Sequence, residues 1–197
     1  MIKKVVLSAA ALVFGTVAFA QVSNNVNQTG GLFGGNDADA LQAGNAIQSD
    51  IDQTGSANVA YISQVGDLLT SDVDQIGYKN DADAIQTGFN QYSKIDQDGF
   101  TNHGHNVQSG RGHQSYITQV SPAFSDGNDA HTTQEGIRSY SEVYQSGREN
   151  NSDVLQTGRT HESYVVQLGR NNDSDVNQSG FVGDNISYVW QYGRNNM

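Results

Sequence analysis

The stretch "SDIDQTGSANVAYISQVG", residues Ser49 to Gly66, contains the same short phrase twice: a Gln, one residue, then a Gly. The two glutamines, Gln53 and Gln64, are 11 residues apart. Repetition at a fixed period is the sequence signature of an architecture that stacks copies of one unit. The fold of this chain therefore depends on how far the period extends and on what each copy contains.

The phrase or a close relative of it occurs 15 times, and 11 of the 14 spacings between successive copies are 11 residues. The other spacings are 14, 15 and 13 residues, so each contains an insertion. Only the copy at Gln119 lacks the following Gly and has Ser121 instead. The repeated glutamines are Gln28, Gln42, Gln53, Gln64, Gln75, Gln86, Gln97, Gln108, Gln119, Gln134, Gln145, Gln156, Gln167, Gln178 and Gln191. The turn glycines that follow them are Gly30, Gly44, Gly55, Gly66, Gly77, Gly88, Gly99, Gly110, Gly136, Gly147, Gly158, Gly169, Gly180 and Gly193.

An 11-residue period is compatible with a right-handed helical supercoil or with short strands. Each copy carries Gly and Asn and few strong helix formers, which argues against helices. Two residues before the Gln, 11 of the 15 copies have Val or Ile, and the residue four before is small in nearly all. Alternation of this kind, closed by Gly, indicates short strands with one face inward. The apolar core column is Val26, Ile51, Ile62, Val73, Ile95, Ile117, Val143, Val154, Val165, Val176 and Val189.

A second period shows that the true unit contains two strands. An Asn stands six residues before every alternate Gln, whereas in the other register only Asn185 matches. The repeat is therefore about 22 residues long, with an 11-residue half-repeat. We expect Gly to turn the chain after one strand, and the Asn, which tolerates left-handed conformations, to begin the next. These asparagines are Asn36, Asn58, Asn80, Asn102, Asn128, Asn150 and Asn172.

A unit of two such short strands cannot bury its apolar face alone, so neighbouring units must stack on it. We predict an all-β, two-sheet parallel β-solenoid with an amyloid-like cross-β arrangement and about 7.5 two-strand rungs, roughly 35 Å long. Stacking arranges the repeated Gln and Asn in columns. We expect amide ladders, in which each side chain bonds to the rungs above and below. The alternative is that these amides are turn-capping residues in solvent.

The first twenty residues are predicted to be a secretory signal peptide. Lys3 and Lys4 supply a positive start, Val5 to Phe14 an apolar stretch, and the chain then reads Ala-Phe-Ala up to Ala20. This order is typical of a cleaved leader and is too short for a membrane span. We therefore divide the chain into a signal peptide, residues 1–20, and a solenoid domain, residues 21–197, and expect no membrane insertion.

The charge of the exported part excludes several kinds of partner. Without Lys3 and Lys4 the 10 basic residues fall to 8 against 21 acidic ones, a net charge of −13. An acidic chain is unsuited to nucleic acid, whose phosphates require clustered Lys and Arg, and to anionic lipid surfaces. The chain has no Cys, so we expect a fold stabilised without disulfides.

Both ends of the predicted solenoid expose a sheet edge. The first strand, Val22 to Gln28, and the last, Asn185 to Gln191, carry the same repeat as the interior. An edge that matches the interior is a template for another copy, and a head-to-tail contact that does not close produces a filament. We expect the chain to polymerise. Because the number of strands is odd, we also expect a staggered joint between subunits.

The sequence contains no set of residues that indicates catalysis. His103 and His105 are spaced as alternate strand residues, and we interpret them as outward polar side chains rather than metal ligands. Asp50 and Asp52 recur 22 residues later and predict columns of like charge, which we interpret as a solvated face that slows premature stacking. We predict no enzyme, no cofactor and no metal site.

The pattern Ser-x-Ile-x-Gln-x-Gly-x-x-Asn-x-Ala-x-Ile-x-Gln, read from Ser49 to Gln64, resembles the curlin repeat of bacterial curli fibres, and the match extends from Val22 to Gln191. The resemblance implies a secreted subunit, most like the major one, that passes through the periplasm and polymerises on the cell surface. There it forms functional amyloid fibres of biofilm matrix and adhesion. Implied partners are copies of itself, a nucleator subunit, an outer-membrane secretion pore and periplasmic chaperones.

Three alternatives stay open at this stage. A monomeric extracellular β-solenoid could be a binding module of the adhesin or ice-binding type, but ice binding typically uses a flat array of Thr, and the outward columns here mix Asp, Tyr, Lys and His. A minor nucleator of the same fibre would be favoured by irregular terminal repeats, and those of this chain are regular. A carbohydrate-active β-helix enzyme would need convergent carboxylates in a groove and longer rungs.

Overall fold

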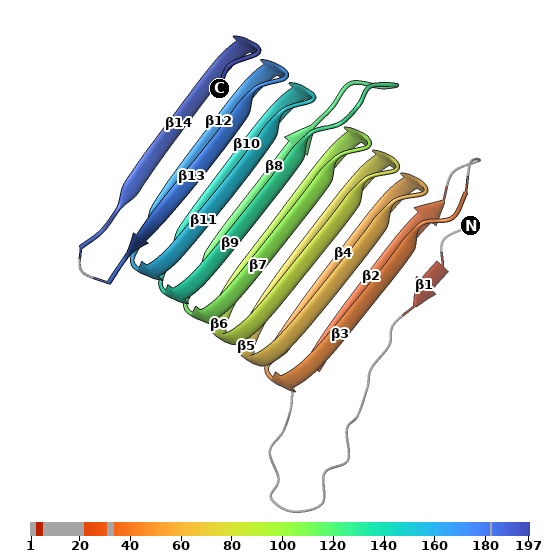
Figure 1. The fold of residues 1–197 in the computed structure, drawn as a ribbon. Helices are drawn as coiled ribbons and strands as arrows, with labels where there is room; N and C mark the ends of the chain where they lie inside the picture. Colours follow the sequence, from red (N-terminus) through yellow and green to blue (C-terminus); the bar gives the residue numbers. More distant parts are fainter. Residues whose placement is uncertain (1–2, 6–21, 31–33, 182) are drawn as a thin grey trace, which may run out of the picture.

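The computed structural model describes residues 3–5, 22–30, 34–181 and 183–197. All of their regular secondary structure is strand (Figure 1). The strands are β1 (Lys3–Val5), β2 (Val22–Gly30), β3 (Asp37–Asn45), β4 (Ile47–Ser56), β5 (Val59–Tyr78), β6 (Asp81–Phe100), β7 (His103–Arg111), β8 (Gln114–Val120), β9 (Asp129–Ile137), β10 (Tyr140–Arg148), β11 (Asn151–Arg159), β12 (Glu162–Arg170), β13 (Asp173–Gly180) and β14 (Ile186–Arg194). No helix in the described part of the chain is long and apolar enough to cross a membrane.

From β2 to β14 the strands form two stacks of parallel, in-register neighbours (Figure 1). The long strands β5 and β6 each bend at one left-handed residue, Leu68 and Asn90, and contribute one half to each stack. The eight-strand stack contains β2, β4, the second halves of β5 and β6, β8, β10, β12 and β14. The seven-strand stack contains β3, the first halves of β5 and β6, β7, β9, β11 and β13. The predicted all-β parallel solenoid is confirmed.

The apolar core lies in the narrow space between the two stacks. The Val and Ile residues that stand two before most repeat glutamines point inward, and Ile51, Ile62 and Val154 are completely buried. Only Val26 and Val189, in the first and last strands of the eight-strand stack, are partly exposed. Burial of such a side chain contributes about 1.5–3 kcal/mol, so the column is a main source of stability.

Two polar residues interrupt the apolar column and satisfy each other. Asn106 Nδ2 donates to Ser93 Oγ at 2.5 Å, and Thr132 Oγ1 donates to Asn106 Oδ1 at 2.8 Å. Ser115 Oγ lies 2.9 Å from Thr132 Oγ1 and continues the chain of bonds into the other stack. All four side chains are buried, so the hydrogen bonds offset the cost of removing them from water.

The turn geometry corrects one prediction. The left-handed residue is not the repeat Asn but the residue before it, for example Ala57 (φ +57°), Lys79 (φ +56°) and Glu149 (φ +57°). Asn58 itself is not left-handed, and its backbone N–H donates to Asn36 Oδ1 of the preceding rung at 3.1 Å. The same position is left-handed at the other lateral edge, for example at Leu68, where no Asn follows, so the left-handed bend belongs to the turn and not to the Asn.

The repeat glycines are required by close backbone contact as well as by φ. Gly55 has φ +115°, and a Cβ there would lie 2.0 Å from the carbonyl oxygen of Gly77 in the next rung. The same hypothetical clash, at 1.6–2.1 Å, recurs at the repeat glycines from Gly44 to Gly169. At Gly30, in the first strand, a Cβ would meet nothing within 4 Å. A side chain at any of the repeat glycines from Gly44 to Gly169 would clash with the backbone of the next rung.

The largest insertion leaves the stack undisturbed. Residues 121–128 form a loop at one lateral edge of the solenoid, between β8 and β9 (Figure 1). Ser121 stands where other copies have Gly, and its hydroxyl accepts from Phe100 N and donates to Phe100 O, both at 2.7 Å. Phe124 at the tip of the loop is 93% exposed. The loop therefore marks one lateral edge of the molecule.

The predicted signal peptide falls outside the described residues except for Lys3–Val5. That segment forms β1, which pairs antiparallel with β2 and places Val5 beside Val26. The outer edge of β2 offers unpaired backbone groups that an extended segment can satisfy. The division of the chain into a signal peptide and a solenoid domain stays a prediction.

Candidate functional site: amide ladders and open sheet ends

Each repeat Gln from Gln42 onward forms two kinds of hydrogen bond. Gln53 Nε2 donates to Gln75 Oε1 at 2.7 Å, along the stack, and to the backbone oxygen of Asp37 at 2.8 Å, across to the other stack. Both hydrogens of the amide are used, and both side chains are at most 1% exposed. Because the bond to the backbone oxygen fixes which amide atom is nitrogen, every Gln points the same way along the stack.

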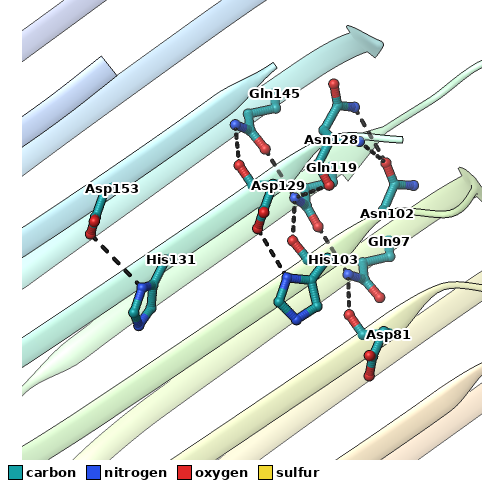
Figure 2. Close-up of polar contacts among 10 residues, drawn as sticks. All are labelled: Asp81, Gln97, Asn102, His103, Gln119, Asn128, Asp129, His131, Gln145 and Asp153. Atoms are coloured by element: carbon teal, nitrogen blue, oxygen red, sulfur yellow. Dashed lines mark hydrogen bonds and ion pairs between the residues drawn. The ribbon is translucent and has the colours of Figure 1, made fainter. Parts of the chain in front are cut away.

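All fifteen glutamines lie in two unbroken ladders with Nε2 to Oε1 distances of 2.7–2.9 Å. Figure 2 shows part of the ladder in the eight-strand stack. That ladder runs through Gln28, Gln53, Gln75, Gln97, Gln119, Gln145, Gln167 and Gln191. The other runs through Gln42, Gln64, Gln86, Gln108, Gln134, Gln156 and Gln178.

The repeat asparagines form a third column at one lateral edge (Figure 2). Asn128 donates to Asn102 Oδ1 from its backbone N at 3.1 Å and from Nδ2 at 3.3 Å. The column continues to Asn196, whose Nδ2 donates to Asn172 Oδ1 at 2.7 Å. Sequence reasoning missed Asn196. The available signal was its position five residues after Gln191, the same offset that separates other repeat asparagines from the preceding Gln.

At the opposite lateral edge the equivalent positions carry different residues, and some reproduce the bonding of Asn. His113 is buried, with Nε2 3.1 Å from Ser109 O, while its Nδ1 accepts from Ser139 N at 3.2 Å. Burial lowers the pKa of His113, which favours the neutral ring that this acceptor role requires. The residues of this column are Ile47, Leu69, Gln91, His113, Ser139, His161 and Asn185.

The outward histidines lie on the seven-strand stack. His103 Nδ1 is 3.0 Å from Asp129 Oδ1, and this hydrogen bond raises the pKa of His103 (Figure 2). The His105 and His131 rings stack at 4.6 Å, and burial together with the His131 charge lowers the pKa of His105. Among the residues that the structure describes, no three His, Asp or Glu side chains converge as a metal site would require.

The paired aspartates lie on the outer face of the eight-strand stack, and their charge is partly balanced. Lys94 Nζ lies 3.2 Å from a carboxylate oxygen of Asp72, 3.2 Å from one of Asp74 and 3.1 Å from one of Asp96. At the first rung two asparagine amides of β2 donate to Asp50 and Asp52, at 2.8 and 2.7 Å. The columns of like charge that the sequence predicts therefore include a cation and two amide donors.

The Gln ladders end differently at the two ends of the solenoid. Among the described residues, no donor bonds to Oε1 of Gln28 or of Gln42, although both donate from Nε2. At the other end Gln178 and Gln191 donate only to backbone oxygens, at 2.9 and 2.6 Å. The end that contains β2 and β3 therefore presents carbonyl acceptors, and the end that contains β13 and β14 presents amide donors.

Unpaired strand edges lie at the same ends of the solenoid as these unfinished ladders. β13 and β14 each pair with only one described neighbour, and so does β3. The outer face of β14 carries exposed aromatic side chains, with Tyr188, Trp190 and Tyr192 between 58% and 63% exposed. Each end of the solenoid thus combines unpaired backbone, open amide ladders and half-buried apolar residues.

Comparison with known protein families gives one match. The model of the curlin associated repeat matches residues 49–77 and 147–180, segments within β4–β5 and β10–β13. No curated protein matches the chain. The two matches support the curlin repeat family, and together with the β-solenoid fold they fit a curli-like structural protein.

Proposed function

We propose that the chain is a secreted structural subunit that polymerises head-to-tail into extracellular curli-like amyloid fibres of biofilm matrix and adhesion. The observation that carries the proposal is the complementarity of the two ends. Gln28 and Gln42 present open carbonyl oxygens, whereas Gln178 and Gln191 present open N–H groups. Donor meets acceptor only when opposite ends of two copies join, so the ladders themselves specify a head-to-tail contact.

Assembly proceeds by templated strand addition. The growing end holds two strand edges and two open amides, and an incoming chain folds onto them as each interior rung folds onto its neighbour. A buried amide without a partner costs about 1–3 kcal/mol, so closing two ladders at each joint favours growth over a free end. Backbone hydrogen bonds along both strands and burial of Val176 against the next rung add to this.

The regular terminal repeats support a major subunit rather than a nucleator. The predicted leader supports export through the periplasm, and the curlin resemblance supports an outer-membrane pore, chaperones and a separate nucleator as partners. The curlin repeat matches support a structural rather than an enzymatic role. Adhesion and matrix formation then follow from a long, acidic, polar-surfaced fibre at the cell surface.

The test is to release purified chain, residues 21–197, from denaturant at neutral pH and to record electron micrographs and fibre diffraction. Every strand of the two stacks lies within this segment. We expect unbranched fibres with reflections near 4.8 and 10 Å. A monomer that stays soluble for days would contradict the proposal and favour a binding solenoid with capped ends.

A further inference from the structure

The half-repeat, rather than the full rung, is the unit that repeats by symmetry. Gln64, in the seven-strand stack, donates to the backbone oxygen of the residue 16 positions earlier at 3.2 Å, and Gln75, in the eight-strand stack, does the same at 2.7 Å. The same offset holds at eleven of the glutamines, across both stacks. Each strand is therefore related to the one before it by the same operation: a half-turn about the solenoid axis and a rise of half a strand spacing.

Applied beyond the last strand, this operation predicts where the next strand belongs. The outermost described strands of the two stacks, β2 and β14, both lie in the eight-strand stack, and no described strand pairs with the outer edge of β13. The C-terminus already turns toward that place, because Asn196 Nδ2 bonds to Asn172 Oδ1 at 2.7 Å and Asp173 N donates to Asn196 O at 2.7 Å. The first strand of an incoming copy would fill it.

Resting on the head-to-tail assembly proposed above, we infer that successive subunits are related by a half-turn about the fibre axis, which exchanges the two stacks. The incoming β2 then pairs with β13, and the incoming β3 pairs with β14. In this arrangement Gln178 donates to Gln28 of the incoming copy, and Gln191 donates to its Gln42. Because Asn196 already lies beside Asn172, the incoming β2 pairs from Asn24 onward.

The exceptional Asn185 supports the half-turn. It is the only Asn in its register, and it lies at the lateral edge where the interior column is mixed. After a half-turn, Asn36 of the incoming copy lies above Asn185 and donates to its Oδ1 from the backbone N and from Nδ2, as Asn150 donates to Asn128 within the chain. Without the half-turn Asn185 would meet Val22, which has no side-chain donor.

The outward residues of the joining strands also support the half-turn. With β3 above β14, Leu41 lies beside Trp190, two side chains that are 54% and 61% exposed at their separate ends. Apolar neighbours on adjacent strands stabilise a sheet. Without the half-turn, β2 would lie on β14 and place Asn27 beside Trp190. It would also leave a missing strand above β13, with its backbone edge and the Gln178 amide unpaired inside the fibre.

Cysteine pairs distinguish the two joints, since the chain has no Cys of its own. Three double variants of residues 21–197 are needed: N27C/N177C joins β2 to β13, L41C/W190C joins β3 to β14, and N27C/W190C joins β2 to β14. Adjacent in-register strands place the paired Cα atoms about 4.8 Å apart, within the roughly 4.4–6.8 Å that a disulfide spans. Fibres are grown under reduction, oxidised after assembly, dissolved and separated on a non-reducing gel.

The half-turn predicts covalent ladders of oligomers from N27C/N177C and L41C/W190C fibres, and monomer from N27C/W190C fibres. Cross-linking of N27C/W190C, or fibres of the first two variants that yield only monomer, would overturn the half-turn and leave the proposed fibre function intact. Failure of the unsubstituted chain to form fibres in electron micrographs would reject both. Because β2 and β14 lie at opposite ends of the solenoid, every cross-link joins two copies (Figure 1).

Discussion

Replacing Gln156 by Ala removes one interior step of an amide ladder. Gln156 is fully buried; its Nε2 donates to Gln178 Oε1 at 2.8 Å and to Tyr140 O at 2.9 Å, and its Oε1 accepts from Gln134 Nε2 at 2.9 Å. The substitution therefore leaves three buried polar groups short of a partner. An unpaired buried polar group costs about 1 kcal/mol at the low end of the usual range, so the folded subunit becomes about 3 kcal/mol less stable.

The assay is the concentration of monomer left in equilibrium with fibres. If a chain folds as it joins the fibre, a loss of about 3 kcal/mol raises this concentration roughly a hundredfold. Asp153→Ala is the matched control three residues away, because its carboxylate is 59% exposed and lies 3.9 Å from His131 Nδ1; we expect a change within about 0.5 kcal/mol. Gln156→Met, which keeps most of the volume, should resemble Gln156→Ala.

Equal residual monomer for Gln156→Ala and Asp153→Ala would refute the ladder reasoning. If Gln156→Ala raised the residual monomer strongly and Gln156→Met left it at the wild-type level, packing volume and not hydrogen bonding would explain why the amide recurs in each repeat. The two controls therefore separate the effects of side-chain exposure, volume and hydrogen bonding on the stability of the fibre.

Four further outcomes follow from the structure. Val154→Asp places a charge in the fully buried apolar column, and we expect a loss on the order of 4 kcal/mol or more, seen as absence of fibres and of strand signal in circular dichroism. Ser152→Ala should stabilise by about 1 kcal/mol and lower the residual monomer about fivefold, because the buried Ser152 Oγ has no partner and Ala130 occupies the neighbouring position. His113 has a lowered pKa in the fold, so its protonation in the unfolded chain should reduce stability as pH falls below about 6.5; the residual monomer of His113→Asn should rise less between pH 7 and pH 5. In micrographs of wild-type fibres the 121–128 loops of successive subunits should alternate between the two lateral edges. Ending the chain at Gly183 removes β14 and leaves an even number of strands, so in fibres of this variant all the loops should lie on one edge.

Much of the fold could be predicted from the sequence because a parallel in-register stack converts a sequence period directly into a spatial one. Gln53 and Gln75 are one full repeat apart in the sequence, and for that reason they lie side by side in the stack. Strand direction, the inward column and the identity of the laddered amides all follow from this relation. Open ends follow too, because the first and last strands resemble the interior.

The details that depend on contact between neighbouring rungs could not be predicted in this way. Lys79 and Glu149 adopt left-handed conformations that their residue types do not favour, because they stand at the turn position that is also left-handed at the other lateral edge, for example at Leu68. The role of His113 as a substitute for Asn depends on a buried acceptor that no periodicity reveals. The hydrogen bond between Thr132 and Asn106 could not be predicted without knowing that these two irregular copies of the repeat are neighbours in one stack.

The most direct measurement is a fibre reconstruction by electron cryomicroscopy at a resolution that shows side-chain amides at the joint between subunits. We expect the strand spacing to stay near 4.8 Å through the joint. We also expect Gln178 of one copy to bond to Gln28 of the next, and Gln191 to Gln42, so that neither ladder is interrupted. A joint with a missing strand, or one in which two like ends meet, would contradict the proposed assembly.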